Sequence, residues 1–259
     1  MTISNEDLTD LRYAKFLLEN PSLAARITDR IGSPIEKGFE RLPEKWANRI
    51  NQIARSSLEK ALNLAVSTLD RRNDRISEDR AHRMLVAATG GAGGAFGLLA
   101  LSVELPVSTS IMLRSIADIA RSEGERITDP EVKLACLEVF ALGGGSTDDD
   151  AAETGYFAVR AMLARAVSEA ARHIAEKGLT RESAPVLVRF ISQVASRFGV
   201  IVSEKAAAQA VPVIGAASGA LINTVFMKHF QDIARGHFIV RRLERTYGTE
   251  LVQAEYEKI

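Results

Sequence analysis

The sequence lacks most of the residues with which proteins cross-link a fold or bind a metal. It has one cysteine, Cys136, among 259 residues. A single cysteine excludes an internal disulfide and a cysteine-based zinc cluster, and it suits a reducing compartment. No two histidines stand at the three- or four-residue spacing of a helical metal pair; the four are His82, His173, His229 and His237. The sequence therefore predicts no metal site.

The chain also lacks a net charge. Its 33 basic and 33 acidic side chains cancel, whereas a protein that coats nucleic acid carries a basic excess. Charged residues make up 25% of the chain, which is too many for a protein with several membrane spans. The first residues, MTISNEDLTDLRY, carry acids where a signal peptide requires bases. We expect no nucleic-acid partner, and a cytoplasmic protein that can associate peripherally with the inner face of the membrane.

Alternating β-strand patterns of useful length are absent, and apolar residues recur at helical spacing along most of the chain. The clearest amphipathic helix is predicted between Pro43 and Asp70, where the apolar face runs from Trp46 to Leu64. Caps, prolines and glycines at the expected places predict further helices over 5–20, 106–124, 130–142, 151–178, 181–199 and 211–248. The sequence therefore predicts one all-α domain, a multi-helix bundle.

The densest glycine stretch is TGGAGGAFG, residues 89–97, which follows the apolar run MLVAA. It resembles a dinucleotide-binding turn, in which glycines bring the backbone close to a pyrophosphate at a helix start. That pattern requires a glycine where Phe96 stands, and a strand where about eighty residues of helical pattern precede the run. The chain contains no Gly-Lys-Ser/Thr either. We therefore expect no nucleotide, and no other cofactor is indicated.

Two uncharged segments, 84–103 and 206–227, place small residues four apart. Their glycines are Gly90, Gly93, Gly94, Gly97, Gly215 and Gly219. On helices this spacing lets two backbones approach closely, and each segment is long enough to span a bilayer. We predict a bundle built around these two Gly/Ala-rich apolar helices, packed against each other. Their use stays open between a permanent soluble core, a hairpin that inserts reversibly into lipid, and a groove for a partner.

Basic residues follow the second uncharged segment: Lys228, Arg241, Arg242 and Arg245. Bases beside an apolar span favour the cytoplasmic side and anionic headgroups. The same bases could instead form ion pairs on a solvated face, with Asp232 and Glu244 as partners. The sequence leaves both interpretations open.

Several motifs in combination resemble the EcsC family. The glycine-rich stretch is followed by ELP at 104–106 and by IADIARSEG at 116–124. The C-terminal region is similar to the family's C-terminal block through Asn223, QDIARGHF at 231–238 and RRLER at 241–245. The resemblance covers about 42–248 and leaves 1–41 as an N-terminal helical extension of the same domain. The family is named after a gene that neighbours an ABC transporter in some bacteria, so the resemblance implies a bacterial protein that works near a membrane.

We therefore expect a non-enzymatic binding or accessory protein, linked to an ABC transporter or to lipid, whose partner is the membrane surface or a membrane protein. The alternative is a hydrolase-like enzyme with an acid-lined cleft beside the apolar helices. Its catalytic candidates are Glu104, Asp232 and Arg235. Glu104 could be a partly buried acid, or only a charge that stabilises a helix start.

Overall fold

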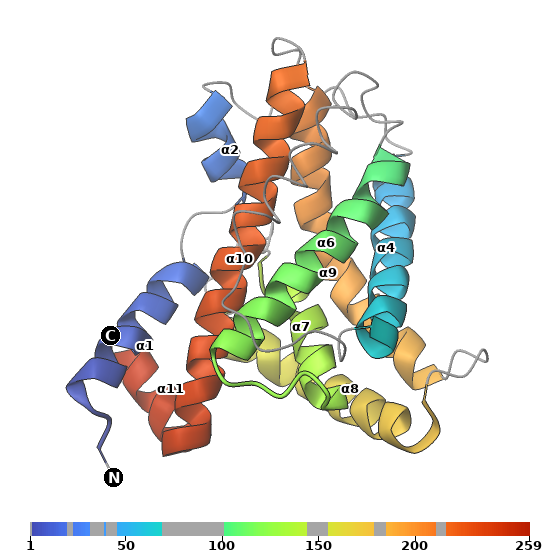
Figure 1. Cartoon of the computed structure of the whole chain (residues 1–259). Helices are drawn as coiled ribbons and strands as arrows, with labels where there is room; N and C mark the ends of the chain where they lie inside the picture. The colour runs from blue at the N-terminus through green and yellow to red at the C-terminus, as the bar shows by residue number, and fades with distance from the viewer. Residues whose placement is uncertain are drawn as a thin grey trace.

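The computed structural model describes residues 2–19, 23–31, 39, 46–68, 101–143, 155–178, 185–210 and 216–259. Within these ranges the chain forms nine helices and no strand, which confirms the predicted all-α multi-helix bundle (Figure 1). The helices are α1 (Asn5–Glu19), α2 (Leu23–Ile31), α4 (Trp46–Thr68), α6 (Leu101–Ser122), α7 (Pro130–Leu142), α8 (Tyr156–Lys177), α9 (Pro185–Ala210), α10 (Ala216–Tyr247) and α11 (Thr249–Lys258).

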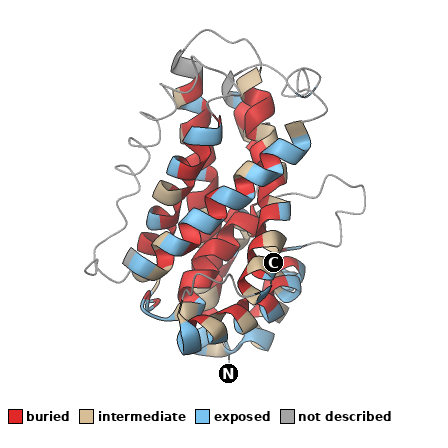
Figure 2. Ribbon diagram, turned by 90° about the vertical axis from the view of Figure 1, so that its right-hand side faces the viewer, coloured by how far each residue is buried: buried red, intermediate tan, exposed pale blue. Residues whose placement is uncertain are grey.

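Helix α10 forms the axis of the bundle. Its 32 residues extend over about 48 Å, and it packs against α1, α2, α6, α7, α9 and α11. Helix α9 runs beside it in the opposite direction (Figure 1). Helix α7 lies inside, where every residue from Val132 to Ala141 is buried. The long helices carry buried residues on their inner faces and exposed residues on their outer faces (Figure 2), as their amphipathic patterns predict.

Four phenylalanines form the centre of the core. Phe140 of α7 lies 5.1 Å, between ring centroids, from both Phe198 of α9 and Phe230 of α10. Phe226 lies one turn away on α10, with its centroid also 5.1 Å from that of Phe230. All four side chains are fully buried. Aromatic pairs at this separation contribute about 0.5–1.5 kcal/mol each beyond their buried area, so the cluster holds α9 and α10 against α7.

The predicted start of α7 is confirmed, whereas that of α6 is wrong. The Asp129 side chain accepts a 3.1 Å hydrogen bond from the Glu131 backbone N–H, and Pro130 occupies the first helical position. Helix α6 begins at Leu101 and not near Pro106, which lies buried inside it. A proline lacks the N–H for one hydrogen bond of the helix. This loss is small beside the burial of most residues in the first three turns of α6.

The prediction of one apolar helix over residues 206–227 is also wrong. Helix α9 continues through Gly199 to Ala210, and α10 begins at Ala216 and runs back along the bundle (Figure 1). The glycine does not end α9. It provides room for α4, because a Cβ at Gly199 would lie 2.1 Å from Asn51 Oδ1. Helices α2 and α11 were not predicted from the sequence.

Helix α1 belongs to the N-terminal extension and packs directly on α10. A Cβ at Gly236 would lie 2.7 Å from Leu18 Cγ and 2.9 Å from the Ala14 carbonyl oxygen, so the two helices approach closely there. Arg242 donates a 2.5 Å hydrogen bond to Asp10 near the other end of α1. The described part of the extension is therefore joined to the core by both packing and charge.

Candidate functional site

The glycines predicted to bring two helices together lie mostly outside the described residues. These are Gly90, Gly93, Gly94, Gly97 and Gly215, and the contact predicted between the two glycine segments lies there too. Gly219 is described and is buried in α10. Close helix approach is seen at two other described glycines, Gly199 and Gly236.

Glu104 is a buried acid, which was one of the two interpretations of this residue from the sequence. Its partner is a lysine. Lys205 Nζ of α9 lies 2.7 Å from Glu104 Oε1, and the two side chains are 0% and 4% exposed. Gln209, one turn further along α9, donates from Nε2 to Glu104 Oε2 at 3.3 Å. The ammonium also lies 4.6 Å from the centroid of the Phe226 ring. Burial lowers the pKa of Lys205, an effect that the nearby carboxylate opposes.

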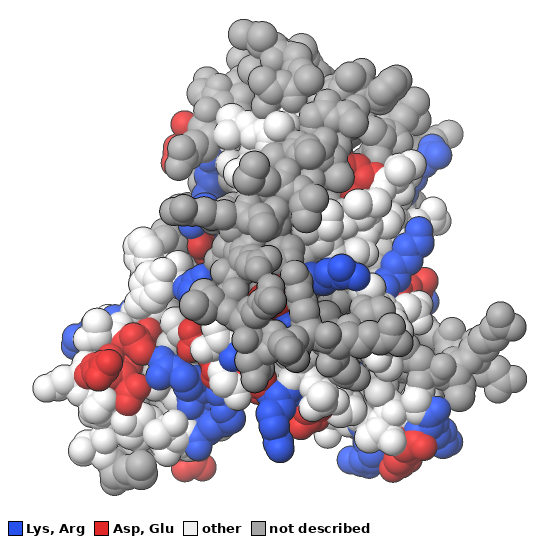
Figure 3. Space-filling view, viewed as in Figure 1, with Lys and Arg blue, Asp and Glu red and all other residues white. Residues whose placement is uncertain are grey.

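This ion pair joins three helix ends that carry no other charge. They are Leu101–Leu113 of α6, Ala206–Ala210 of α9 and Ala216–Met227 of α10, and we call them the uncharged end. The segments of α6 and α10 each extend over about 18–20 Å. Val103 and Val107 are 72% and 44% exposed on this end. Among the described residues visible in Figure 3, many charged side chains gather over the lower part of the molecule.

The predicted arginines of the basic flank are ion-paired within the chain. Arg241 Nε donates to Glu125 at 2.8 Å, and Arg245 bonds to the same carboxylate. Arg242 Nε donates to Glu123 at 3.0 Å. These arginines lie in the C-terminal half of α10, at the end of the helix remote from Ala216. The arrangement favours the ion-paired interpretation for all three arginines, although the acids are not the two considered from the sequence.

The residues of the hydrolase alternative do not form one site. Asp232 lines a groove between α1, α2 and α10, where it accepts hydrogen bonds from Arg26 at 2.7 Å and from Lys228 at 2.9 and 3.0 Å. Arg235 lies three residues further along α10 and does not line that groove. Glu104 instead bonds to α9, so the two carboxylates occupy separate ion pairs.

A second buried polar cluster was missed in the sequence. The Tyr156 hydroxyl lies 2.9 Å from His237 Nδ1, and burial lowers the pKa of His237 well below its usual value, which favours the neutral ring. Glu138 of α7 is 5% exposed, and its burial raises its pKa to about 7. Arg160, beside it, donates two hydrogen bonds to Glu244, at 2.8 and 2.9 Å. The available signal was an acid inside the apolar run LACLEVFAL.

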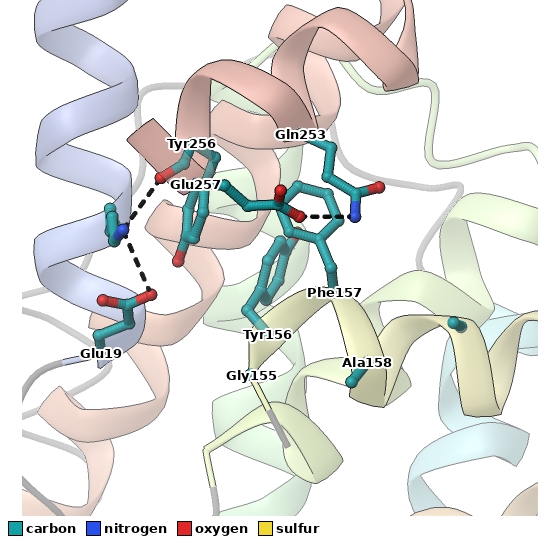
Figure 4. A pocket seen from close by; sticks show the side chains of 10 residues that line it. Glu19, Gly155, Tyr156, Phe157, Ala158, Gln253, Tyr256 and Glu257 are labelled. Carbon is teal, nitrogen blue, oxygen red and sulfur yellow. Dashed lines mark hydrogen bonds and ion pairs between the residues drawn. The ribbon is translucent and has the colours of Figure 1, made fainter. Parts of the chain in front are cut away.

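A pocket of about 520 Å³ lies near this cluster, between α1, the start of α8 and α11 (Figure 4). Lys15 Nζ donates to the Tyr256 carbonyl oxygen at 2.9 Å and lies 4.0 Å from Glu19. The Phe157 ring stands edge-on to both Tyr156 and Tyr256, with centroids 5.0 and 5.1 Å apart. The groups that line this pocket are therefore largely engaged with one another.

The EcsC protein family matches residues 16–243. The chain belongs to this family. In this EcsC-family chain the match begins inside α1, and not near residue 42 as the resemblance suggested, so the family region includes most of the groove and all of the uncharged end. Neither a curated protein nor a solved structure matches the chain.

One described helix of this EcsC-family protein, α9, is long and apolar enough to cross a membrane. Half of its most apolar window is buried inside the bundle, and the core helix of a soluble protein has the same character. Within the described ranges, no three His, Cys, Asp or Glu side chains gather as a metal ion would require. Among the described features, the uncharged end and the groove beside it are therefore the candidate binding surfaces.

Proposed function

We propose that this EcsC-family protein binds the surface of a lipid bilayer through its uncharged end, as a non-enzymatic accessory protein on the inner face of the membrane. The observation that carries the proposal is the single charged residue of these three helix segments, Glu104. It is buried against Lys205 and adds no charge to the surface.

The energetic argument concerns the cost of placing charge in lipid. An Asp, Lys or Arg side chain at the centre of a membrane helix costs about 2.5–3.5 kcal/mol. The uncharged end avoids this cost, since its exposed large side chains are Val103, Val107 and Leu221. The bulk of the described charge lies elsewhere on the molecule, so lipid contact at this end requires no ion pair to break.

On α6 and α10 the uncharged end is bordered by a basic residue. Arg114 follows the α6 segment and is exposed, and Lys228 follows the α10 segment with 53% of its side chain exposed. Long basic side chains can extend toward headgroups while their stems stay in apolar surroundings. Each contributes about 1 kcal/mol near an anionic surface. We therefore expect binding to anionic vesicles that weakens as salt is added.

Flotation of the full chain with vesicles of phosphatidylethanolamine and phosphatidylglycerol at low salt tests the proposal. The double variant Val103→Glu/Val107→Glu places charge on exposed positions of the uncharged end. Its partition coefficient should fall about tenfold, since even part of the cost of charge in lipid exceeds 1.4 kcal/mol. The matched control is Met162→Glu in α8, because Met162 is also an exposed apolar residue, at 53%. It should float like the wild type.

Three outcomes would reject the proposal. The wild type could stay at the bottom of the gradient with every vesicle. The double variant could float as well as the wild type, which would show that the protein contacts the vesicle through another surface. The protein could also bind native membranes but not pure lipid, which would indicate a membrane-protein partner, such as a transporter, in place of lipid.

A further inference from the structure

The groove between α1, α2 and α10 has a volume of about 520 Å³, and its apolar part lies within the α10 segment of the uncharged end. Its floor is one face of α10, which presents Leu221, Val225, Lys228 and Asp232 in that order. These residues are four, three and four positions apart, so they lie in one row along the helix. Leu221 and Lys228 are separated by about 10 Å along the axis. The floor therefore changes from apolar to charged with distance from the uncharged end.

The charged part of the groove holds both signs. Asp232 is 14% exposed and accepts from Arg26 and Lys228, whereas Lys228 keeps about half of its side chain in solvent. An ammonium group has three N–H donors, and two hydrogen bonds to Asp232 leave Lys228 able to donate another. Asp29 of α2 is exposed on the same wall. Among the described lining residues, a ligand here would meet the exposed ammonium of Lys228 and the exposed carboxylate of Asp29.

The remaining wall is aromatic. Tyr13 and Phe16 of α1 line the groove and are 47% and 60% exposed. Exposed rings attract quaternary or primary ammonium groups through their π-faces, by about 0.5–1 kcal/mol at exposed sites. Together with Asp29 they suit the positive part of a ligand, while Lys228 suits a phosphate. Leu221 and Val225 offer an apolar surface to an alkyl chain.

We propose that this groove binds a single zwitterionic phospholipid with an ammonium headgroup, of the phosphatidylethanolamine type. The phosphate lies at Lys228, the ammonium at Asp29 and the aromatic wall, and the acyl chain along Leu221 toward the uncharged end. The proposal rests on the proposed lipid-binding function and names its ligand. The volume is within the 300–1,000 Å³ of small-molecule sites, so it accommodates the headgroup and the first part of one chain.

The test is calorimetric titration of the full chain with dihexanoyl phosphatidylethanolamine, kept below the concentration at which it forms micelles. Dihexanoyl phosphatidylglycerol lacks the ammonium and should bind at least about fivefold more weakly, and free phosphoethanolamine lacks the chains and should bind more weakly again. Lys228→Gln should weaken binding of the ethanolamine lipid about tenfold, as expected for one lost charged hydrogen bond. Lys228→Arg should keep most of the affinity.

The matched control is Lys258→Gln on α11, an exposed lysine that also pairs with an acid one turn away, Glu255. It should bind the lipid like the wild type. Equal affinity for the two lipids, unchanged binding by Lys228→Gln, or free phosphoethanolamine bound as tightly as the lipid would each overturn the groove assignment. If the wild type floated with vesicles but did not bind the short-chain lipid, the groove assignment would be overturned and the proposed membrane contact would not. Val103→Glu/Val107→Glu should do the reverse and reduce only flotation, because neither valine lines the groove.

Discussion

The buried pair of Glu104 and Lys205 allows a direct test of how the uncharged end is packed. Nζ lies 2.7 Å from Oε1, and neither side chain is more than 4% exposed. Removal of one partner from such a pair leaves a buried charge without compensation, which costs about 3–5 kcal/mol. We expect Lys205→Met to lower the free energy of unfolding by this amount. Methionine keeps an unbranched stem against Phe226, so packing changes little and the loss reports the charge.

The companion change is removal of both charges. Replacement of a buried ion pair by apolar residues of similar volume is often neutral or stabilising. The double variant Glu104→Leu/Lys205→Met should therefore recover most of the loss, so the effects of the two substitutions should be far from additive.

Urea unfolding followed by far-ultraviolet circular dichroism measures these differences on the full chain. A loss of 3–5 kcal/mol corresponds to a decrease in Tm of roughly 6–20 °C for a domain of this size. Lys60→Met, at an exposed lysine of α4, is the control and should stay within about 0.5 kcal/mol of the wild type. The reasoning would be refuted if Lys205→Met and Glu104→Leu each cost under 1 kcal/mol of unfolding free energy. It would also be refuted if the loss in the double variant equalled the sum of the two single losses. Either result would mean that the pair is solvated.

Three further predictions concern other described contacts. Burial raises the pKa of Glu138 from 4.5 to about 7, so the fold favours the protonated acid and loses stability as pH rises between these values. Relative to Glu138→Gln, the wild type should lose up to about 3 kcal/mol of unfolding free energy from pH 4.5 to 8. Parallel stability curves for the two proteins would contradict this. Burial lowers the pKa of His229 from 6.5 to about 4, so the fold favours the neutral ring and loses stability as pH falls through this range. His229→Gln should therefore flatten the acid side of the plot of unfolding free energy against pH. An unchanged plot would show that another group causes the loss of stability in acid. Gly236→Ala gains about 1 kcal/mol of helix propensity, but the new Cβ would meet Leu18 and the α1 backbone. Urea unfolding should therefore show a net loss of about 1–3 kcal/mol in unfolding free energy. A stabilised variant would show that α1 packs more loosely on α10.

Helix identity could be predicted from the sequence wherever a helix has an amphipathic face or a clear cap. Asp129 and Pro130 marked the start of α7 because capping depends on neighbouring residues only. Gly199 misled because its role is tertiary: it makes room for Asn51 of α4, which is far away in the sequence. A glycine that ends a helix and a glycine that admits a neighbouring helix are indistinguishable without the partner. The same limit applies to Gly236, whose partner is on α1.

The chemistry of the candidate site was predictable in kind but not in pairing. Glu104 was suspected of burial because apolar residues surround it, but its partner Lys205 is a hundred residues away. The arginines of the basic flank were identified, although Glu123 and Glu125, which bind them, lie before α7 in the sequence. Side chains that pair across elements leave no periodic trace in either segment. Charge partners on other helices therefore had to come from the structure, whereas Asp232, which pairs with Lys228 one turn away, was considered from the sequence.

The distribution of these pairs along α10 favours one orientation for the proposed contact with a membrane. The C-terminal half of the helix holds Arg242 and Arg245, which bind acids of α1 and of the turn after α6. Contact of that half with anionic lipid would set headgroups in competition with several internal ion pairs at once. The N-terminal half has no such pair on its surface before Lys228, so it can approach lipid without loss of an internal contact. For the proposed membrane contact, an orientation with the uncharged end toward the bilayer, and α8 and α11 away from it, is therefore the one that leaves the described fold intact.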